Sequence, residues 1–251
     1  MIIIFIFIIL CIFIYLLIQY INPHTIISSL KYLVPNNSNE FLDKQIYFPD
    51  HKILEDNFKL IQDECINILN TYNQNIPEFK EIDENQKTIC REGKWRMFML
   101  RLLNKNLPNS NLTPNTIKLI NQCSNIRSAF FSILEPKSSL PPHHGEQYSI
   151  FRYHLPLLVP EPDLCKLIVN NKEKQWKEGE GFMFDDTFLH SATNNSSKPR
   201  VILFLDIERN DMNLLAKSVD YVINELIKYH PKYKEAVLKS EPKQQSLLEL
   251  R

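Results

Sequence analysis

Hydrophobic positions divide the chain into stretches with different periods, and the first has no period at all. An unbroken apolar run from Ile2 to Ile18, extended by Tyr20 and Ile21, reaches about the 20 residues that cross a bilayer core as a helix. No basic residue precedes the run and no small-x-small cleavage site follows it, which favours an anchor over a cleaved signal peptide. We expect residues 1–21 to be a transmembrane anchor and the location to be membrane, single-pass. The orientation stays open, because Lys31 is the first charged residue.

A helical period begins after a polar stretch. Residues 22–50 contain "NPH", "VPNNSNE" and "FPD", and such clusters of proline and asparagine are typical of a linker. Between Leu54 and Tyr72, apolar residues then recur every three or four positions. These are Phe58, Ile61, Cys65, Ile68, Leu69 and Tyr72. The spacing predicts an amphipathic helix at the start of a folded domain that we place at residues 51–210.

From about residue 95 the pattern becomes that of strands. Short apolar or alternating runs such as "WRMFMLRLL", "RSAFFSILE", "YSIFRYHLPLLV" and "RVILFLDIER" are separated by turn residues. Several such runs at this spacing predict an antiparallel sandwich or barrel. The last segment, residues 211–251, returns to a helical period up to Tyr229, and we expect Pro231 to end that helix and a polar tail to follow.

Composition narrows the classes of function. Lys and Arg total 29, as do Asp and Glu, so the chain lacks the basic surplus that nucleic-acid binding requires. We therefore expect no nucleic acid as a partner. The five cysteines include no C-x-x-C pair, which argues against a zinc knuckle or a dense disulfide framework.

The candidate chemistry lies in two segments. The first, "PPHHGEQYSIFRYHLPL" at residues 141–157, contains three histidines, although two adjacent histidines alone could be a solvated turn. The second is "WKEGEGFMFDDTFLHSATNNSSKPRVILFLDIER", in which His190 follows one strand and Arg200 opens the next. Histidines after two different strands, with an arginine beside them, are typical of a β cup that holds iron with open coordination positions and anchors a dicarboxylate.

These segments resemble the aspartyl/asparaginyl β-hydroxylase family. The resemblance is carried by "FSILEPKSSLPPHHGEQYSIFRYHLPLLVP", the "WKEGE" turn and "FDDTFLHSATNN", and it covers roughly residues 45–210. It implies a mainly β fold, a double-stranded β-helix (jelly roll) with flanking α-helices, after the N-terminal transmembrane helix. It also implies an Fe(II)- and 2-oxoglutarate-dependent dioxygenase. Members hydroxylate Asp or Asn side chains of proteins or, in the bacterial lipid A hydroxylases, an acyl chain.

The resemblance also assigns roles to single residues. His143 and His190 match the two iron-binding histidines, and Arg200 matches the arginine that pairs with the distal carboxylate of 2-oxoglutarate. A guanidinium fork suits that planar, bidentate contact better than lysine does.

Three further residues match positions around the cosubstrate. Ser132 matches a serine that assists the arginine, and Arg152 and His154 match residues near the iron-proximal carboxylate. Taken without the motif, Ser132 would be an ordinary strand serine, His154 a satisfied interior histidine and Arg200 a surface arginine at the start of a strand. Asp185 and Asp186 are assigned to the turn before His190 or to orienting its imidazole.

The chain departs from the commonest pattern at one position. Many 2-oxoglutarate oxygenases supply a third ligand from an H-x-[DE] unit, but Gly145 stands two residues after His143. The animal aspartyl hydroxylases resemble this chain in that respect. A competing frame is His144-Gly145-Glu146, itself H-x-E, which would form a facial triad with His190. The spacing to "RYH" favours His143.

The sequence thus predicts a membrane-anchored dioxygenase that hydroxylates Asp or Asn side chains of a protein substrate near a membrane. The alternative substrate is a lipid acyl chain. A third hypothesis is a domain that binds a partner without catalysis.

Overall fold

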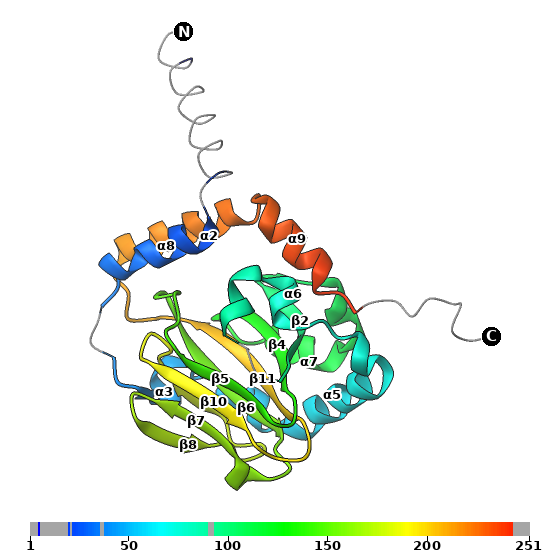
Figure 1. Cartoon of the computed structure of the whole chain (residues 1–251). Helices are drawn as coiled ribbons and strands as arrows, with labels where there is room; N and C mark the ends of the chain where they lie inside the picture. Colours follow the sequence, from blue (N-terminus) through cyan, green and yellow to red (C-terminus); the bar gives the residue numbers. More distant parts are fainter. Residues whose placement is uncertain (1–4, 6–19, 21, 36–37, 90–92, 243–251) are drawn as a thin grey trace, which may run out of the picture.

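The computed structural model describes residues 5, 20, 22–35, 38–89 and 93–242. Two antiparallel sheets pack face to face as a jelly-roll sandwich, with helices on the outer face of one sheet and across one end (Figure 1). The predicted mainly β fold with flanking helices is confirmed.

The larger sheet has the strand order β1-β9-β6-β11-β4-β2-β3, and the smaller has the order β5-β10-β7-β8. The strands are β1 (Phe41–Leu42), β2 (Trp95–Leu102), β3 (Lys105–Asn106), β4 (Ile126–Leu134), β5 (Ser138–His143), β6 (Ile150–Leu158), β7 (Cys165–Val169), β8 (Lys172–Gln175), β9 (Phe182–Phe184), β10 (His190–Asn194) and β11 (Arg200–Glu208).

The helices precede, interrupt and follow the strands along the chain. The α-helices are α2 (Pro23–Ser28), α3 (Lys44–Tyr47), α4 (His51–Glu55), α5 (Phe58–Tyr72), α6 (Phe79–Ile82), α7 (Pro114–Ile120), α8 (Leu214–Ile227) and α9 (Pro231–Lys239). The 3-10 turns are η1 (Ser29–Tyr32), η2 (Asn73–Asn75), η3 (Glu84–Thr88), η4 (Pro108–Leu112) and η5 (Pro162–Leu164).

The larger sheet separates two apolar clusters, because successive side chains of a strand point to opposite faces. In β4, Phe131 and Ile133 belong to the cluster under α5 and α7, whereas Phe130 belongs to the cluster between the two sheets. The predicted amphipathic helix is α5, and it buries Ile61 and Cys65 in the first cluster.

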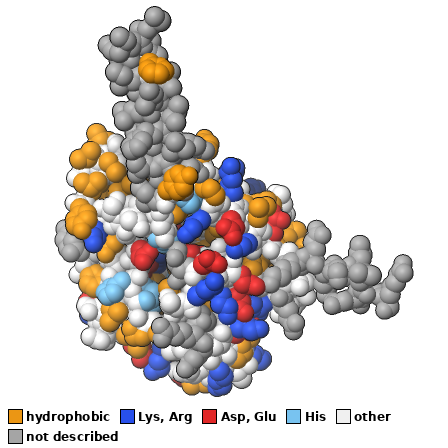
Figure 2. Space-filling model, turned by 45° about the horizontal axis from the view of Figure 1, so that its top comes forward, with side chains coloured by type: hydrophobic (Ala, Val, Ile, Leu, Met, Phe, Trp, Pro, Cys, Tyr) orange, Lys and Arg blue, Asp and Glu red, His pale blue; other side chains and the backbone are white. Residues whose placement is uncertain are grey.

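One end of the sandwich is covered by helices from the two ends of the described chain. Residues 22–50, predicted as a linker, contain α2 and η1, and Leu30 of η1 packs with Met212 and Ala216 next to and within α8. Figure 1 shows α2 and α8 side by side above the sheets. On the face that carries these helices, acidic and basic side chains are intermixed (Figure 2).

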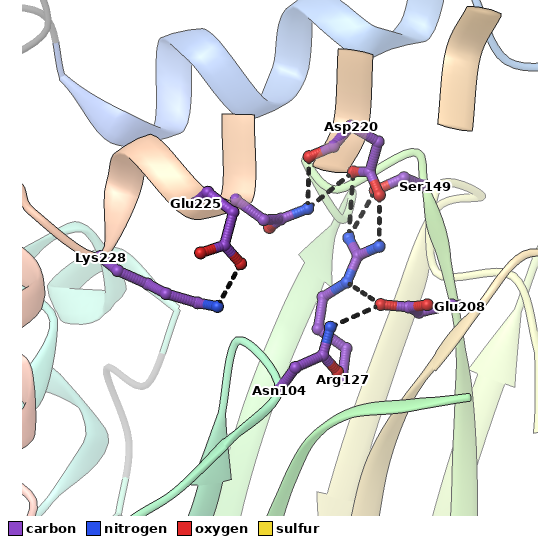
Figure 3. Close-up of polar contacts among 8 residues, drawn as sticks. Asn104, Arg127, Ser149, Glu208, Asp220, Glu225 and Lys228 are labelled. Atoms are coloured by element: carbon purple, nitrogen blue, oxygen red, sulfur yellow. Dashed lines mark hydrogen bonds and ion pairs between the residues drawn. The ribbon is translucent and has the colours of Figure 1, made fainter. Parts of the chain in front are cut away.

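A buried ion pair fixes α8 to the sheets. Arg127 is 1% exposed and donates to both carboxylate oxygens of Asp220 in α8, to Ser149 Oγ at 2.7 Å and to Glu208 Oε1 at 3.2 Å (Figure 3). Removing one partner of such a pair leaves an uncompensated buried charge, which typically costs about 3–5 kcal/mol. The position of α8 over the sandwich is therefore strongly specified.

Within residues 211–242, the structure contains one helix more than the sequence predicted. The helix expected up to Tyr229 is α8, but Pro231 begins α9 instead of only ending α8. Proline is well suited to the first turn of a helix, where its missing N–H has no partner to lose.

The prediction of a single-pass membrane location is corrected by the structure. Among the residues that the structure describes, no helix is both long and apolar enough to cross a membrane. The predicted anchor, residues 1–21, lies outside the described residues apart from Phe5 and Tyr20.

Candidate metal and cosubstrate site

Two histidines meet between strands of the smaller sheet. His143 ends β5, His190 begins β10, and the two residues are directly paired in the antiparallel register. Their ring centroids are 4.1 Å apart. In the sequence these histidines are 47 positions apart and are linked only by a motif. The pairing of β5 with β10 brings them together.

Backbone carbonyls orient both imidazoles in the same way. Nδ1 of His143 lies 2.8 Å from the carbonyl oxygen of Pro141, and Nδ1 of His190 lies 3.0 Å from that of Phe188. A carbonyl can only accept, so each Nδ1 donates and each Nε2 keeps its lone pair. Burial, and then the neighbouring His190, lower the pKa of His143 to about 4, and burial also lowers the pKa of His190. Neutral imidazoles with free Nε2 lone pairs are what a divalent metal binds.

Asp186 explains why glycine stands at position 145. A Cβ on Gly145 would lie 2.1 Å from Oδ2 of Asp186, so the carboxylate occupies the space that a side chain at 145 would need. The Gly145 N–H also donates to the Asp186 carbonyl at 2.7 Å. Asp186 Oδ1 is buried and has no hydrogen-bond partner among the described residues. Its neighbour Asp185 accepts from the backbone N–H and the hydroxyl of Thr187, and so stabilises the turn before His190.

Arg152 lies between two carboxylates. Its Nε donates to Asp186 at 2.7 Å and its Nη1 donates to Asp206. Burial lowers the pKa of Arg152, but the two carboxylates raise this pKa by more than burial lowers it. The guanidinium therefore stays charged. One guanidinium between two carboxylates leaves one negative charge close to the histidine pair. The sequence did not single out Asp206, although the alternation of Arg200, Ile202, Phe204 and Asp206 along β11 could have shown that it faces the interior.

Arg200 is a buried cation that lacks an anionic partner within the described part of the chain. It is 2% exposed, its guanidinium lies 4.5 Å from the centre of the Trp176 ring, and its Nε and Nη1 have no hydrogen-bond partner among the described residues. Burial lowers its pKa to about 10. Burying an unpaired charge is unfavourable, so a guanidinium in this position indicates a site for an anion.

Ser132 and His154 add hydrogen-bond donors to the same interior. The Ser132 hydroxyl accepts from Trp95 Nε1 at 2.9 Å, which leaves its O–H free to donate. His154 Nδ1 lies 3.2 Å from Trp176 Nε1, a donor, so the proton of this buried imidazole is on Nε2, which has no partner in the described part of the chain. Burial, and then Arg200, hold the pKa of His154 well below its usual range.

The competing H-x-E frame is not assembled. His144 is exposed and its Nδ1 lies 2.8 Å from the Thr187 carbonyl, while Glu146 pairs with His24 at 2.9 Å. Within the described residues there is no group of three or more His, Cys, Asp or Glu side chains that could hold one metal ion. The structure thus brings together His143 and His190 but not His144 and Glu146.

All the predicted site residues line one cavity of about 550 Å³ between the sheets. These are Ser132, His143, Arg152, His154, His190 and Arg200. The cavity has the size and the mixture of apolar wall and few polar groups that are usual for small-molecule sites. It continues beyond the histidine pair under α6 and α9, a part that the sequence did not predict.

Comparison with known proteins identifies the family of the chain. The family model for aspartyl/asparaginyl beta-hydroxylase matches residues 55–210. The ornithine lipid ester-linked acyl 2-hydroxylase of Rhizobium tropici is 32% identical over 192 residues, which cover 76% of this chain and 68% of that protein. The aspartyl/asparaginyl beta-hydroxylase of Mus musculus is 30% identical over 163 residues, 62% of this chain but only 21% of the relative.

Among solved structures, a predicted oxalate decarboxylase from Thermotoga maritima is 20% identical, with a TM-score of 0.32, and the match covers 47% of this chain and 83% of that one. The strand order of the two sheets, and not this similarity, defines the fold. Since the family model spans more than half of the 251 residues, the chain belongs to the aspartyl/asparaginyl β-hydroxylase family.

Proposed function

We propose that this protein is an Fe(II)- and 2-oxoglutarate-dependent hydroxylase, with the iron on His143 and His190 and the distal carboxylate of 2-oxoglutarate on Arg200. The observation that carries the proposal is the unpaired Arg200 guanidinium in the same cavity as two histidines with free Nε2 lone pairs. An anion that also chelates the metal would satisfy both at once.

The remaining polar residues fit this assignment. Ser132 has a free hydroxyl hydrogen with which to support Arg200, and the unpartnered Nε2–H of His154 is a second donor for a carboxylate. The negative charge left over around Arg152 favours a cation at the histidines. The Asp186 carboxylate occupies the space that a side chain at position 145 would need, and glycine offers no ligand, so the proposed metal-binding set is His143 and His190.

Iron with 2-oxoglutarate supplies the oxidant that transfers one oxygen atom of O2 to a C–H bond of the substrate. The contribution of the chain is to hold both groups in a buried cavity and to orient them. Carbonyl hydrogen bonds at Nδ1 fix the two imidazoles, and Asp186 and Asp206 fix Arg152.

Two substrate classes follow from the family. An Asp or Asn side chain of a protein is the substrate that the sequence predicts, and the names of the mouse relative and the family model support it. An acyl chain is supported by the name of the Rhizobium tropici relative, of which the chain covers the larger share.

The test is an anaerobic titration of the full chain with Fe(II), with and without 2-oxoglutarate, followed by the weak visible charge-transfer band of the chelate. We expect the band only when both are present, and we expect a His143→Ala/His190→Ala double variant to lack it. Absence of iron binding by the folded wild-type chain would instead support a non-catalytic binding domain.

A further inference from the structure

The cavity has a second part, which we call the apolar arm. It is the region bounded by Phe79, Ile82, Met99, Leu102, Ile227 and Ala236. These residues come from α6, β2, α8 and α9, so the arm lies where α6 and α9 contact each other over the edge of the larger sheet (Figure 1).

The floor of the arm continues from the candidate site along one row of the sheet. Across the strands, His154 of β6 pairs with Phe204 of β11, Phe204 pairs with Phe130 of β4, and Phe130 pairs with Met99 of β2. Phe204 and Phe130 stack with ring centroids 4.5 Å apart. Residues directly opposite in a sheet share a face, so the row leads without interruption from the site to the arm.

Charged side chains also line the cavity beside the arm, Glu84 and Lys232 among them, and several of these charges are paired. Lys239 of α9 lies 2.6 Å from Glu235, and His24 of α2 bridges Asp83 at 3.1 Å and Glu146 at 2.9 Å. The carboxylates of Asp83 and Glu146 raise the pKa of His24 against the opposing effect of burial. Between these charges the wall is formed mainly by aliphatic and aromatic side chains, together with the buried hydroxyl of Tyr233.

We propose that the apolar arm binds a single unbranched aliphatic chain, so that the substrate is a long-chain acyl group. The inference rests on the proposed function, because the histidine pair is what would act on the chain. A methylene chain buries favourably on such a wall and needs no hydrogen bonds. A peptide around an Asp or Asn side chain would bury several N–H and C=O groups, for which the described wall of the arm offers little beyond the Tyr233 hydroxyl, and such burial is costly.

The arm can be tested separately from the chemistry by measuring how acyl chains of different length bind to the whole metal-free protein. The probes are straight-chain fatty acids from octanoate to hexadecanoate, measured by displacement of a fluorescent fatty acid. We expect affinity to rise about fourfold for each added methylene and then to reach a plateau when the arm is full. Absence of chain-length dependence would overturn the proposal, whether or not iron and 2-oxoglutarate bind.

Two further measurements identify the kind of molecule that carries the acyl chain. Monoacyl phospholipids with the same chain lengths distinguish a lipid-borne acyl group from a free fatty acid, and either result with chain-length dependence supports the proposal. An Asp-containing peptide that competes with the fluorescent probe while the fatty acids do not would contradict it.

A matched pair of variants on α9 tests where the acyl chain binds. Ala236 lines the arm and is partly buried, whereas Leu238 on the same helix is 72% exposed. We expect Ala236→Phe to weaken hexadecanoate binding by about tenfold or more and to shorten the chain length at the plateau. Leu238→Phe should leave both unchanged. Equal effects of the two variants would mean that the acyl chain binds elsewhere. If Ala236→Phe fails to fold, the chain-length series on the wild-type protein still tests the proposal.

Discussion

The two parts of the cavity differ in how their side chains are satisfied. At the histidine end, buried polar atoms of His154, Asp186 and Arg200 have no partner among the described residues, whereas the described wall of the apolar arm, apart from the Tyr233 hydroxyl, consists mainly of side chains that need none. Unpartnered buried polar atoms reduce the stability of the fold, so their presence in one place indicates groups kept for ligands. The arm carries one such atom, the Tyr233 hydroxyl, and the function proposed for it rests on shape and hydrophobicity.

The largest effect is expected where the histidine end would lose its metal. His143→Ala and His190→Ala should each abolish iron retention and 2-oxoglutarate turnover, because the proposed site has two protein ligands and each variant removes one of them. His144→Ala is the control and should keep the iron, since its ring contacts the Thr187 carbonyl outside the pair. Iron analysis after gel filtration decides. Loss of iron in His144→Ala with retention in His143→Ala would establish the H-x-E frame instead.

Arg200 provides the next largest contrast between the two parts. Arg200→Ala should raise the 2-oxoglutarate requirement by roughly 30-fold to several thousand-fold, because losing one partner of a buried charge pair costs about 2–5 kcal/mol. Iron binding should stay near normal, and Arg200→Lys should recover only part of the affinity.

The same arginine should lower stability in the absence of ligand. Arg200→Met replaces an unpaired buried cation by an apolar side chain of similar length, so the metal-free variant should unfold at a higher temperature than the wild type.

An unchanged 2-oxoglutarate dependence in Arg200→Ala would remove this residue from the site.

Gly145→Ala should have an intermediate effect. The new methyl group would overlap the Asp186 carboxylate and force it away from Arg152, which we expect to lower the free energy of unfolding by about 1–3 kcal/mol. Gly145→Asp should not create a third metal ligand, because Asp186 occupies that space. Chemical denaturation and iron affinity measure the two effects, and tighter iron binding by Gly145→Asp would show that Asp186 moves aside.

The smallest effect is expected in the arm. The Tyr233 hydroxyl of α9 is buried, lacks a hydrogen-bond partner in the described structure and belongs to a residue that lines the cavity. Tyr233→Phe should therefore keep the affinity for hexadecanoate within about twofold and raise stability by up to about 1 kcal/mol. A much weaker affinity in this variant would mean that the bound molecule carries a polar group at α9.

Local patterns were sufficient where one element or one motif carried the information. The helical spacing predicted α5, and the alternating runs predicted an antiparallel β domain. The motif around His143 and His190 predicted two residues that the structure pairs directly. The apolar run at residues 1–21 was the exception, since the structure describes no helix long and apolar enough to cross a membrane.

The sequence by itself determined which side chains face the interior, because alternation along a strand and the period of a helix are local properties. Only the tertiary structure decided which interior surfaces meet. Asp186 occupies the space beside Gly145 because the loop after β5 lies against the end of β9. The apolar arm exists because α6 and α9, about 150 residues apart in the sequence, contact each other. Such contacts are set by long-range strand pairing and helix packing, on which the local period carries no information.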